Sequence, residues 1–160
     1  MPNSSLTYEL YDAFQRAELD RWDAIIAPDV LTNSPAQLGF EGLKSLKTWA
    51  KAFASTLAYR IDLIDEHLAL DSNGDGRGFI TFNLHWKHSA EFLGVAPTGR
   101  EGTSVETLLL TIRNSKIVRI GVADNSLDLA FYLWERGLPY PHNWEPEPIK
   151  TGIDRRRSSA

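Results

Sequence analysis

The chain has 160 residues, of which 42% are hydrophobic and 24% charged, and its net charge at pH 7 is −4. This length suits one domain with a substantial core, while an acidic chain without a basic stripe in its body excludes a nucleic-acid-binding protein. The absence of Cys excludes disulfides and thiolate chemistry, and because no run of roughly 20 apolar residues and no signal-peptide pattern occurs, we expect a cytoplasmic protein without a membrane span.

The N-terminal segment has the periodicity of helices. Along Leu6–Ala27 the apolar residues recur every three or four positions, as one face of a helix requires. The phase breaks at Glu18–Asp20, so the pattern predicts two consecutive helices. We expect Pro28 to end the second helix and residues 29–35 to form a short edge strand.

A further helix and a series of strands follow. Glu41–Ala58 places its large apolar residues on one stripe and its Lys residues mostly elsewhere, which predicts an amphipathic helix that covers a sheet. A tight turn is expected at Asn114–Ser115. The predicted strands are Tyr59–Leu70, Phe79–Lys87, Thr103–Arg113 and Lys116–Ala123.

The turn after the first long strand is rich in Asn, Asp and Gly. Asp71–Gly76 matches the opening of a calcium-binding loop, but Phe82 occupies the position of the closing Glu, and the flanking residues predict strands instead of helices. We therefore interpret this stretch as a hairpin turn. The sequence shows no cluster of metal ligands.

The longest connection between two predicted strands is His88–Arg100, with the sequence HSAEFLGVAPTGR. Its Gly and Pro residues interrupt regular structure. Phe92, Leu93 and Val95 alternate with these turn residues, so the connection can pack onto the body of the protein. We expect an ordered segment that forms the rim of a cavity.

The C-terminal part falls into two pieces. Leu127–Trp134 has the pattern of a helix that ends near Gly137. Residues 138–160 are Pro-rich and then basic, which predicts an arm with a solvated tail. We therefore expect one domain over residues 1–137, followed by this arm.

The order of these elements predicts an α+β domain. A cone-shaped, curved antiparallel sheet would carry the helices on its concave face. Such an arrangement leaves an apolar pocket between the helices and the sheet, where a hydrophobic small molecule would bind. The open face of the sheet and the Pro-rich arm also predict a homodimer or a higher homo-oligomer.

The segment His88–Arg100 resembles the signature His-x-Gly-x-Phe-x-Gly-x-Pro-x-Thr-Gly-Arg of the SnoaL-like polyketide cyclases (ester cyclases), with Ala90 in place of the usual Gly. This family belongs to the cone-shaped, nuclear-transport-factor-two-like superfamily. The resemblance covers about Tyr8–Gly137 and extends to the segments APDVLTNSP, GFEGLKSLKTWAKAF, KIV and LDLAFYLWERG. It implies the same cone-shaped α+β fold.

The resemblance also implies a reaction, an intramolecular aldol ring closure of a polyketide-like carbonyl compound without cofactor or metal. A carboxylate on the last strand acts as acid and base, assisted by a polar residue on the first strand and another on the penultimate strand. These assisting positions fall on Asn33 and Thr111. In a gapless alignment the carboxylate position falls on Asn125, but a one-residue bulge would bring Asp124 into the cavity instead.

Only one of Asp124 and Asn125 enters the cavity from a regular strand, because neighbouring residues point to opposite faces. We predict Asp124 as the acid/base residue, with Asn33 and His88 assisting, and Asn125 and Thr111 as substrate-binding residues. A structural role stays open for each catalytic candidate: a helix start for Asp124, a turn for Asn33, and a hydrogen bond that holds the connection for His88.

Aromatic residues complete the predicted site. We expect Trp49, Phe53, Tyr59, Phe82 and Trp86 to line the cavity, with packing in the core as the alternative. His85 lies three residues before His88, so the two histidines face opposite sides of a strand and form no metal pair. Two other functions stay open: a ligand-binding protein that has lost the base, and isomerase or hydrolase chemistry in the same cavity.

Overall fold

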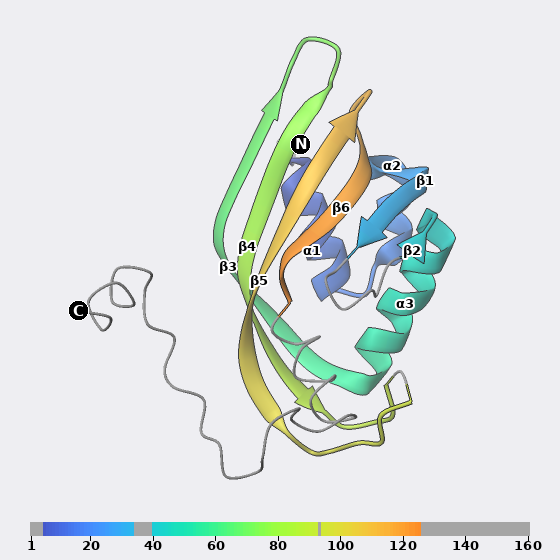
Figure 1. Ribbon diagram of the computed structural model, residues 1–160, viewed down its shortest axis with the longest axis vertical. Coiled ribbons are helices and arrows are strands. Elements are labelled where there is room, and N and C mark those ends of the chain that lie inside the picture. The colour runs from blue at the N-terminus through green and yellow to red at the C-terminus, as the bar shows by residue number, and fades with distance from the viewer. Residues whose placement is uncertain (1–4, 34–39, 93, 126–160) are drawn as a thin grey trace, which may run out of the picture.

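The computed structural model describes residues 5–33, 40–92 and 94–125 of the chain. Within these ranges the strands form one six-stranded sheet, in the order β2-β1-β6-β5-β4-β3, and the helices lie on its concave side (Figure 1). The elements are α1 (Leu6–Gln15), the 3-10 helix η1 (Leu19–Arg21), α2 (Trp22–Ile25), β1 (Ile26–Asn33), β2 (Phe40–Glu41), α3 (Leu43–Thr56), β3 (Leu57–Leu70), β4 (Gly76–His88), β5 (Glu101–Arg113) and β6 (Lys116–Asn125).

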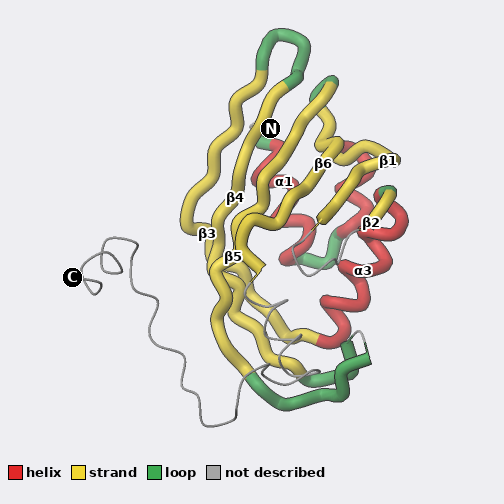
Figure 2. The backbone as a smooth tube through the Cα atoms, viewed as in Figure 1, coloured by secondary structure: helices red, strands yellow, loops and turns green. Residues whose placement is uncertain are grey.

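This architecture confirms the predicted α+β class with helices on a curved sheet. All neighbouring strands are antiparallel except β1 and β6, which run parallel, so the sheet is mixed at this end. Figure 2 shows the long strands β3, β4 and β5 curving around the helical layer. Among the helices of the described ranges, none is long and apolar enough to cross a membrane.

Two consecutive helical segments begin the fold, as predicted. Ser5 caps α1, because its Oγ accepts a hydrogen bond of 3.1 Å from the backbone N–H of Tyr8. The chain turns at Ala17, whose φ is +57°, and then enters η1 and α2. The expectation that Pro28 ends the second helix is wrong. The helix ends at Ile25 and Pro28 lies within β1, where the register with β6 is interrupted and the missing N–H costs no ladder hydrogen bond.

Alternation along the long strands gives the sheet two different faces. In β4 the side chains of Ile80, Phe82, Leu84 and Trp86 are buried, and the residues between them are more exposed. Side chains of successive strand residues point to opposite faces. The inward face of β4 therefore meets the helices, and the other face lies on the outside of the sheet.

The two hairpin turns follow the predicted chemistry. Asp71 Oδ1 accepts hydrogen bonds from the backbone N–H groups of Asn73 and Asp75, at 2.8 and 3.0 Å. This role in the turn explains why acidic and amide residues gather here. Asn114 and Ser115 have φ values of 48° and 59°, as a type I′ turn requires.

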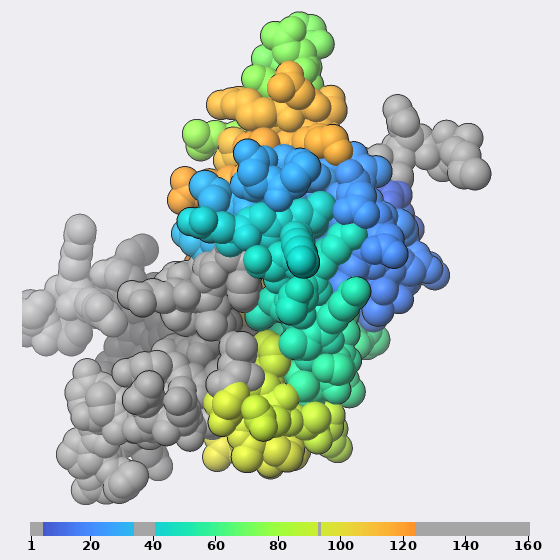
Figure 3. Space-filling model, turned by 90° about the vertical axis from the view of Figure 1, so that its right-hand side faces the viewer, coloured from blue at the N-terminus to red at the C-terminus, as the bar shows by residue number. Residues whose placement is uncertain are grey.

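The two ends of the connection between β4 and β5 are hydrogen-bonded to each other. The N–H of His88 donates to the carbonyl of Arg100 at 2.8 Å, and the N–H of Gly99 donates to the carbonyl of His88 at 2.9 Å. Within the connection Phe92 and Val95 form a small β-bridge, and the Phe92 side chain is 3% exposed. Figure 3 shows this segment in yellow-green beside the end of α3.

The predicted covering helix is α3, whose buried residues include Leu46, Ala50 and Phe53. It crosses the concave side of the sheet together with α1 (Figure 1). The helix predicted over Leu127–Trp134 and the arm of residues 138–160 lie outside the described residues. The domain boundary at residue 137 therefore stays a prediction.

Candidate active site

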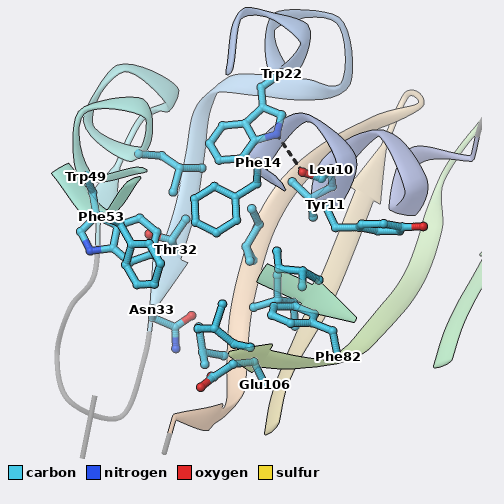
Figure 4. A pocket seen from close by; sticks show the side chains of 16 residues that line it. Leu10, Tyr11, Phe14, Trp22, Thr32, Asn33, Trp49, Phe53, Phe82 and Glu106 are labelled. Atoms are coloured by element: carbon cyan, nitrogen blue, oxygen red, sulfur yellow. Dashed lines mark hydrogen bonds between the residues drawn. The ribbon is translucent and has the colours of Figure 1, made fainter. Parts of the chain in front are cut away.

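A cavity of about 140 Å³ lies between the helices and the concave face of the sheet (Figure 4). The helices supply one wall, and inward-facing residues of five strands supply the other. The lining residues are Leu10, Tyr11, Phe14, Trp22, Thr32, Asn33, Leu46, Trp49, Phe53, Ile61, Phe82, Leu84, Glu106, Leu108, Ile120 and Val122.

The helical wall is a cluster of packed aromatic rings. Phe14 lies at its centre, with ring centroids 6.0 Å from Trp22, 6.3 Å from Trp49 and 5.6 Å from Phe53. The indole N–H of Trp22 donates to the backbone carbonyl of Leu10 at 3.0 Å, the bond drawn in Figure 4. Because these rings hold one another, the wall has a fixed shape.

Glu106 introduces a carboxylate into this apolar cavity. Its residue is 7% exposed, and among the sixteen lining residues it is the only one with a charged side chain. It lies on β5, where it is paired with Phe82 of β4. In Figure 4 Glu106 and Asn33 lie at one end of the cavity and Trp22 lies at the other. The cavity therefore has a polar end and an aromatic end.

Sequence reasoning missed Glu106, although the signal was present. In β5 the buried residues Ser104, Glu106, Leu110 and Ile112 all have the same parity. This alternation places Glu106 on the inward face of the strand. A Glu residue at an inward-facing position of such a strand is unusual, because acidic residues are rarely buried. A buried carboxylate is therefore a candidate for a functional residue.

Tyr11 is a second ionisable residue of the lining. Burial is the main reason why its pKa is raised above 10.0, and the negative charge of Glu66 adds to this effect. The phenol is therefore neutral at physiological pH. In Figure 4 its hydroxyl group points away from Glu106 and Asn33, so Tyr11 contributes the side of its ring to the cavity wall.

Asn33 borders the cavity at the end of β1, as the resemblance implies. Its Oδ1 accepts a hydrogen bond of 3.5 Å from Nη2 of Arg119, an exposed residue of β6. The register pairs Asn33 with Gly121. The amide therefore sits at the edge of the cavity, with its oxygen held by a residue of the outer face.

The register of β6 locates the positions Asp124 and Asn125. Leu108 is paired with Val122 and Thr107 with Asp124, so Ala123 is an extra residue that forms a bulge. This bulge does not give Asp124 the register position opposite Glu106, unlike the bulge considered from the sequence. Beyond it, Asn125 is paired with Glu106. Residues paired across antiparallel strands share a face. Asn125 thus has the register position opposite Glu106, and Asp124 has the one opposite Thr107.

His88 is fully buried but does not line the cavity. Its Nδ1 accepts a hydrogen bond of 3.3 Å from the backbone N–H of Thr98 and lies 3.1 Å from Thr98 Oγ1. These contacts hold the β4–β5 connection. His85 lies on the other face of β4, where Nε2 is 2.9 Å from Asp62 Oδ2 and Nδ1 is 2.8 Å from Thr103 Oγ1. The two histidines are thus separated, as expected.

The aromatic predictions divide into two groups. Trp49, Phe53 and Phe82 line the cavity. Tyr59 and Trp86 do not: the hydroxyl of Tyr59 donates to the carbonyl of Phe14 at 2.7 Å, and Trp86 Nε1 donates to a serine hydroxyl of β5 at 2.9 Å. Both have roles in the core, and burial raises the pKa of Tyr59 to about 12.

Thr111 also lies away from the cavity. It stands between the buried residues Leu110 and Ile112 of β5, so it belongs to the opposite face of the sheet. Its register partners are Arg77 of β4 and Arg119 of β6. The structure therefore brings together Asn33, Trp49 and Phe53 with the unpredicted Glu106, and separates them from His88, Thr111, Tyr59 and Trp86.

Known structures share this fold. A candidate polyketide cyclase from Pseudomonas putida matches with a TM-score of 0.65 and 17% identity, over 79% of this chain and 96% of that chain. AclR from Streptomyces galilaeus, described as a candidate hydroxylase, matches with a TM-score of 0.64 and 19% identity, over 84% and 95%. An LEH-like epoxide hydrolase from M. tuberculosis matches with a TM-score of 0.58 and 11% identity, over 82% and 84%. Identities this low establish the fold alone.

The family itself follows from the sequence. No curated protein matches the chain. The family model described as SnoaL-like polyketide cyclase, in contrast, matches residues 5–130, a range that includes α1, the cavity lining and the whole β4–β5 connection. The chain therefore belongs to the SnoaL-like polyketide cyclase family.

Proposed function

We propose that the protein binds a hydrophobic carbonyl compound in this cavity and catalyses a cofactor-independent, acid/base reaction of the aldol type. The observation that carries the proposal is Glu106, a buried carboxylate at the polar end of an aromatic cavity. A carboxylate in an apolar site is suited to remove a proton next to a carbonyl group and to return it later.

The chemistry needs few groups. Glu106 takes a proton from the carbon next to one carbonyl, and the resulting enolate carbon forms a bond to a second carbonyl carbon. The alkoxide formed there receives the proton back, so protons and electrons balance. Hydrogen-bond donors at the polar end stabilise the enolate oxygen. Asn33 at the edge and the hydroxyl group of Thr32 are the candidates for this role.

Asp124 remains a second candidate for the acid/base role, because the family resemblance assigns a carboxylate to the last strand. Its register position is one residue from that of Asn125, which is paired with Glu106. Asn125 and Thr111 remain candidates for substrate contacts, and His88 for an assisting role. Glu106 is preferred as the base because its side chain lines the cavity.

The test is proton exchange from the methyl group of acetophenone, a neutral aromatic ketone, in deuterated water. Nuclear magnetic resonance would follow the exchange for the wild-type protein and for Glu106→Gln, Asp124→Asn and Glu101→Gln. Glu101 is exposed on the same strand and serves as the matched control. We expect Glu106→Gln to slow the enzyme-dependent exchange by about 10²- to 10⁴-fold, the usual contribution of general acid/base catalysis.

The other outcomes identify the alternatives. Loss of exchange in Asp124→Asn but not in Glu106→Gln would assign the base to Asp124. Full exchange in both variants, or none in the wild type, would contradict this carboxylate mechanism and favour a non-catalytic ligand-binding protein. Isomerase or epoxide hydrolase chemistry uses the same juxtaposition of acid and amide, so hydrolysis of styrene oxide by the wild type would favour that function.

We also propose that the protein is a cytoplasmic homodimer. The outer face of the sheet carries Leu31, Val105 and Leu109, which are 49%, 44% and 52% exposed. Leu109 is paired with Gly121, so a protruding side chain lies beside a position without one. About a twofold axis, the protruding Leu109 of each copy could pack over Gly121 of the other, so a second copy of the chain fits this face.

Cysteine cross-linking tests this assembly, since the chain contains no Cys. Under mild oxidation a Leu109→Cys variant should form a covalent dimer, whereas Leu70→Cys, at an exposed leucine near the β3–β4 turn, should not. Light scattering should give twice the chain mass. A monomer at all concentrations would disprove the dimer.

A further inference from the structure

We propose that the ligand part held in the cavity is a single neutral ring that carries a carbonyl or hydroxyl group, and that the cavity rejects carboxylates. This inference rests on the proposed function of the cavity as a ligand site, and it specifies the ligand. Three observations carry it: the charge of the lining, the volume of the cavity and the packing of the aromatic wall.

The charge of the lining selects against anions. Among the described lining residues there is one carboxylate, Glu106, and no Lys, Arg or His. An anionic ligand would therefore lose its hydration and meet a like charge without a counter-charge from these residues. A neutral ligand has neither cost, and its hydroxyl or carbonyl group has hydrogen-bonding partners at the polar end.

The volume limits the inserted part to one ring. The cavity measures about 140 Å³, close to the roughly 150 Å³ of an apolar protein cavity that holds one benzene molecule. Pockets that take drug-sized compounds measure roughly 300 to 1,000 Å³. A fused three-ring compound therefore exceeds the space between these walls.

The wall cannot easily yield to a larger ligand. Phe53 is 3% exposed and contacts four further rings, with centroids 5.6 Å from Phe14, 5.2 Å from Trp49, 5.3 Å from Tyr59 and 5.7 Å from Phe92. Moving it would disturb both α1 and the β4–β5 connection. Close-packed interiors adapt poorly to added volume.

The binding experiment uses two pairs of compounds. Benzamide and benzoate have nearly the same shape but differ in charge, and acetophenone and anthrone differ in the number of fused rings. Binding would be followed by tryptophan fluorescence, because Trp22 and Trp49 line the cavity, and by calorimetry. At pH 7 we expect benzamide to bind at least about tenfold more tightly than benzoate, and acetophenone more tightly than anthrone.

Two variants link the selectivity to named residues. Glu106→Gln should reduce the difference between benzamide and benzoate to less than about threefold, and Phe53→Ala should admit anthrone. Glu101→Gln should retain the wild-type selectivity. Equal affinity of the wild type for benzamide and benzoate, tighter binding of anthrone, or no binding of any compound would overturn the inference. Selective binding without acetophenone exchange would instead disprove only the proposed catalysis.

Discussion

His88 offers a direct test of whether the family signature supports structure or chemistry. Its side chain is 0% exposed, its Nδ1 accepts from the backbone N–H of Thr98, and it does not line the cavity. Replacement by Ala removes this hydrogen bond, which costs about 1 kcal/mol because the N–H of the exposed Thr98 can bond to water instead, and creates a cavity in place of the ring. We expect His88→Ala to reduce the free energy of unfolding by about 3 kcal/mol in total.

This loss corresponds to a decrease in Tm of about 6–12 °C for a domain of this size. Thermal and urea unfolding would be followed by circular dichroism, and acetophenone exchange would be measured well below the transition. Thr98→Val is the matched control, because it keeps the imidazole and removes the hydroxyl group that lies beside His88 Nδ1 and accepts from the N–H of Arg100; it should cost about 1 kcal/mol. A variant that keeps wild-type stability but loses exchange would refute the structural role and make His88 an assisting residue of the reaction.

Three smaller predictions concern stability. The pKa of Asp12 is lowered from 3.8, mainly by the hydrogen bond from Arg21. The ionised Asp12 therefore stabilises the fold above pH 3.8, and this stabilisation is lost as the pH falls below that value. Between pH 2 and about 5, the free energy of unfolding in urea should depend less on pH for Asp12→Asn than for the wild type. Tyr59→Phe should reduce the free energy of unfolding by about 1 kcal/mol, and the ultraviolet titration of the variant should lack the tyrosine that ionises near pH 12. In the wild type, the contribution of Tyr59 to stability should be lost as the pH rises from about 10 through 12, because the pKa of Tyr59 is higher in the folded protein. Gly74→Ala should reduce the free energy of unfolding measured in urea by more than about 1 kcal/mol, because Gly74 has a φ of +75° and an added Cβ would lie 2.8 Å from the backbone N of Ser115.

Much of the fold could be predicted because its local signals agree. Alternating apolar residues, a type I′ turn at Asn114–Ser115 and an amphipathic covering helix all indicate long hairpins beneath helices. The expectation for Pro28 was wrong because a proline next to a helical pattern usually ends the helix. Here the chain enters a strand before the proline, and the tertiary pairing of β1 tolerates it.

The candidate site was predicted less completely, since it depends on which face each strand presents. Trp49 and Phe53 could be predicted as lining residues, because both belong to the apolar face of α3. Tyr59 and Trp86 are also aromatic residues, but they pack in the core. For Thr111, alternation with its apolar neighbours was sufficient to place it outside. The position of the bulge at Ala123 could not be predicted from the sequence, because a bulge depends on how two strands pair.

That bulge decides how the family signature relates to the chemistry. Before it, Ile120 and Val122 line the cavity, so an uninterrupted β6 would give the next cavity-face position to Asp124. The extra residue shifts the register, so that Asn125 and not Asp124 is paired with Glu106 of β5. In our proposal the acid/base residue, Glu106, therefore lies on the penultimate strand, β5, whereas the resemblance implies a carboxylate on the last strand, β6. The family signature lies in the β4–β5 connection, so it does not determine which of the two adjacent strands supplies the carboxylate. Family membership points to the cavity, whereas the strand register points to Glu106 as the residue to test.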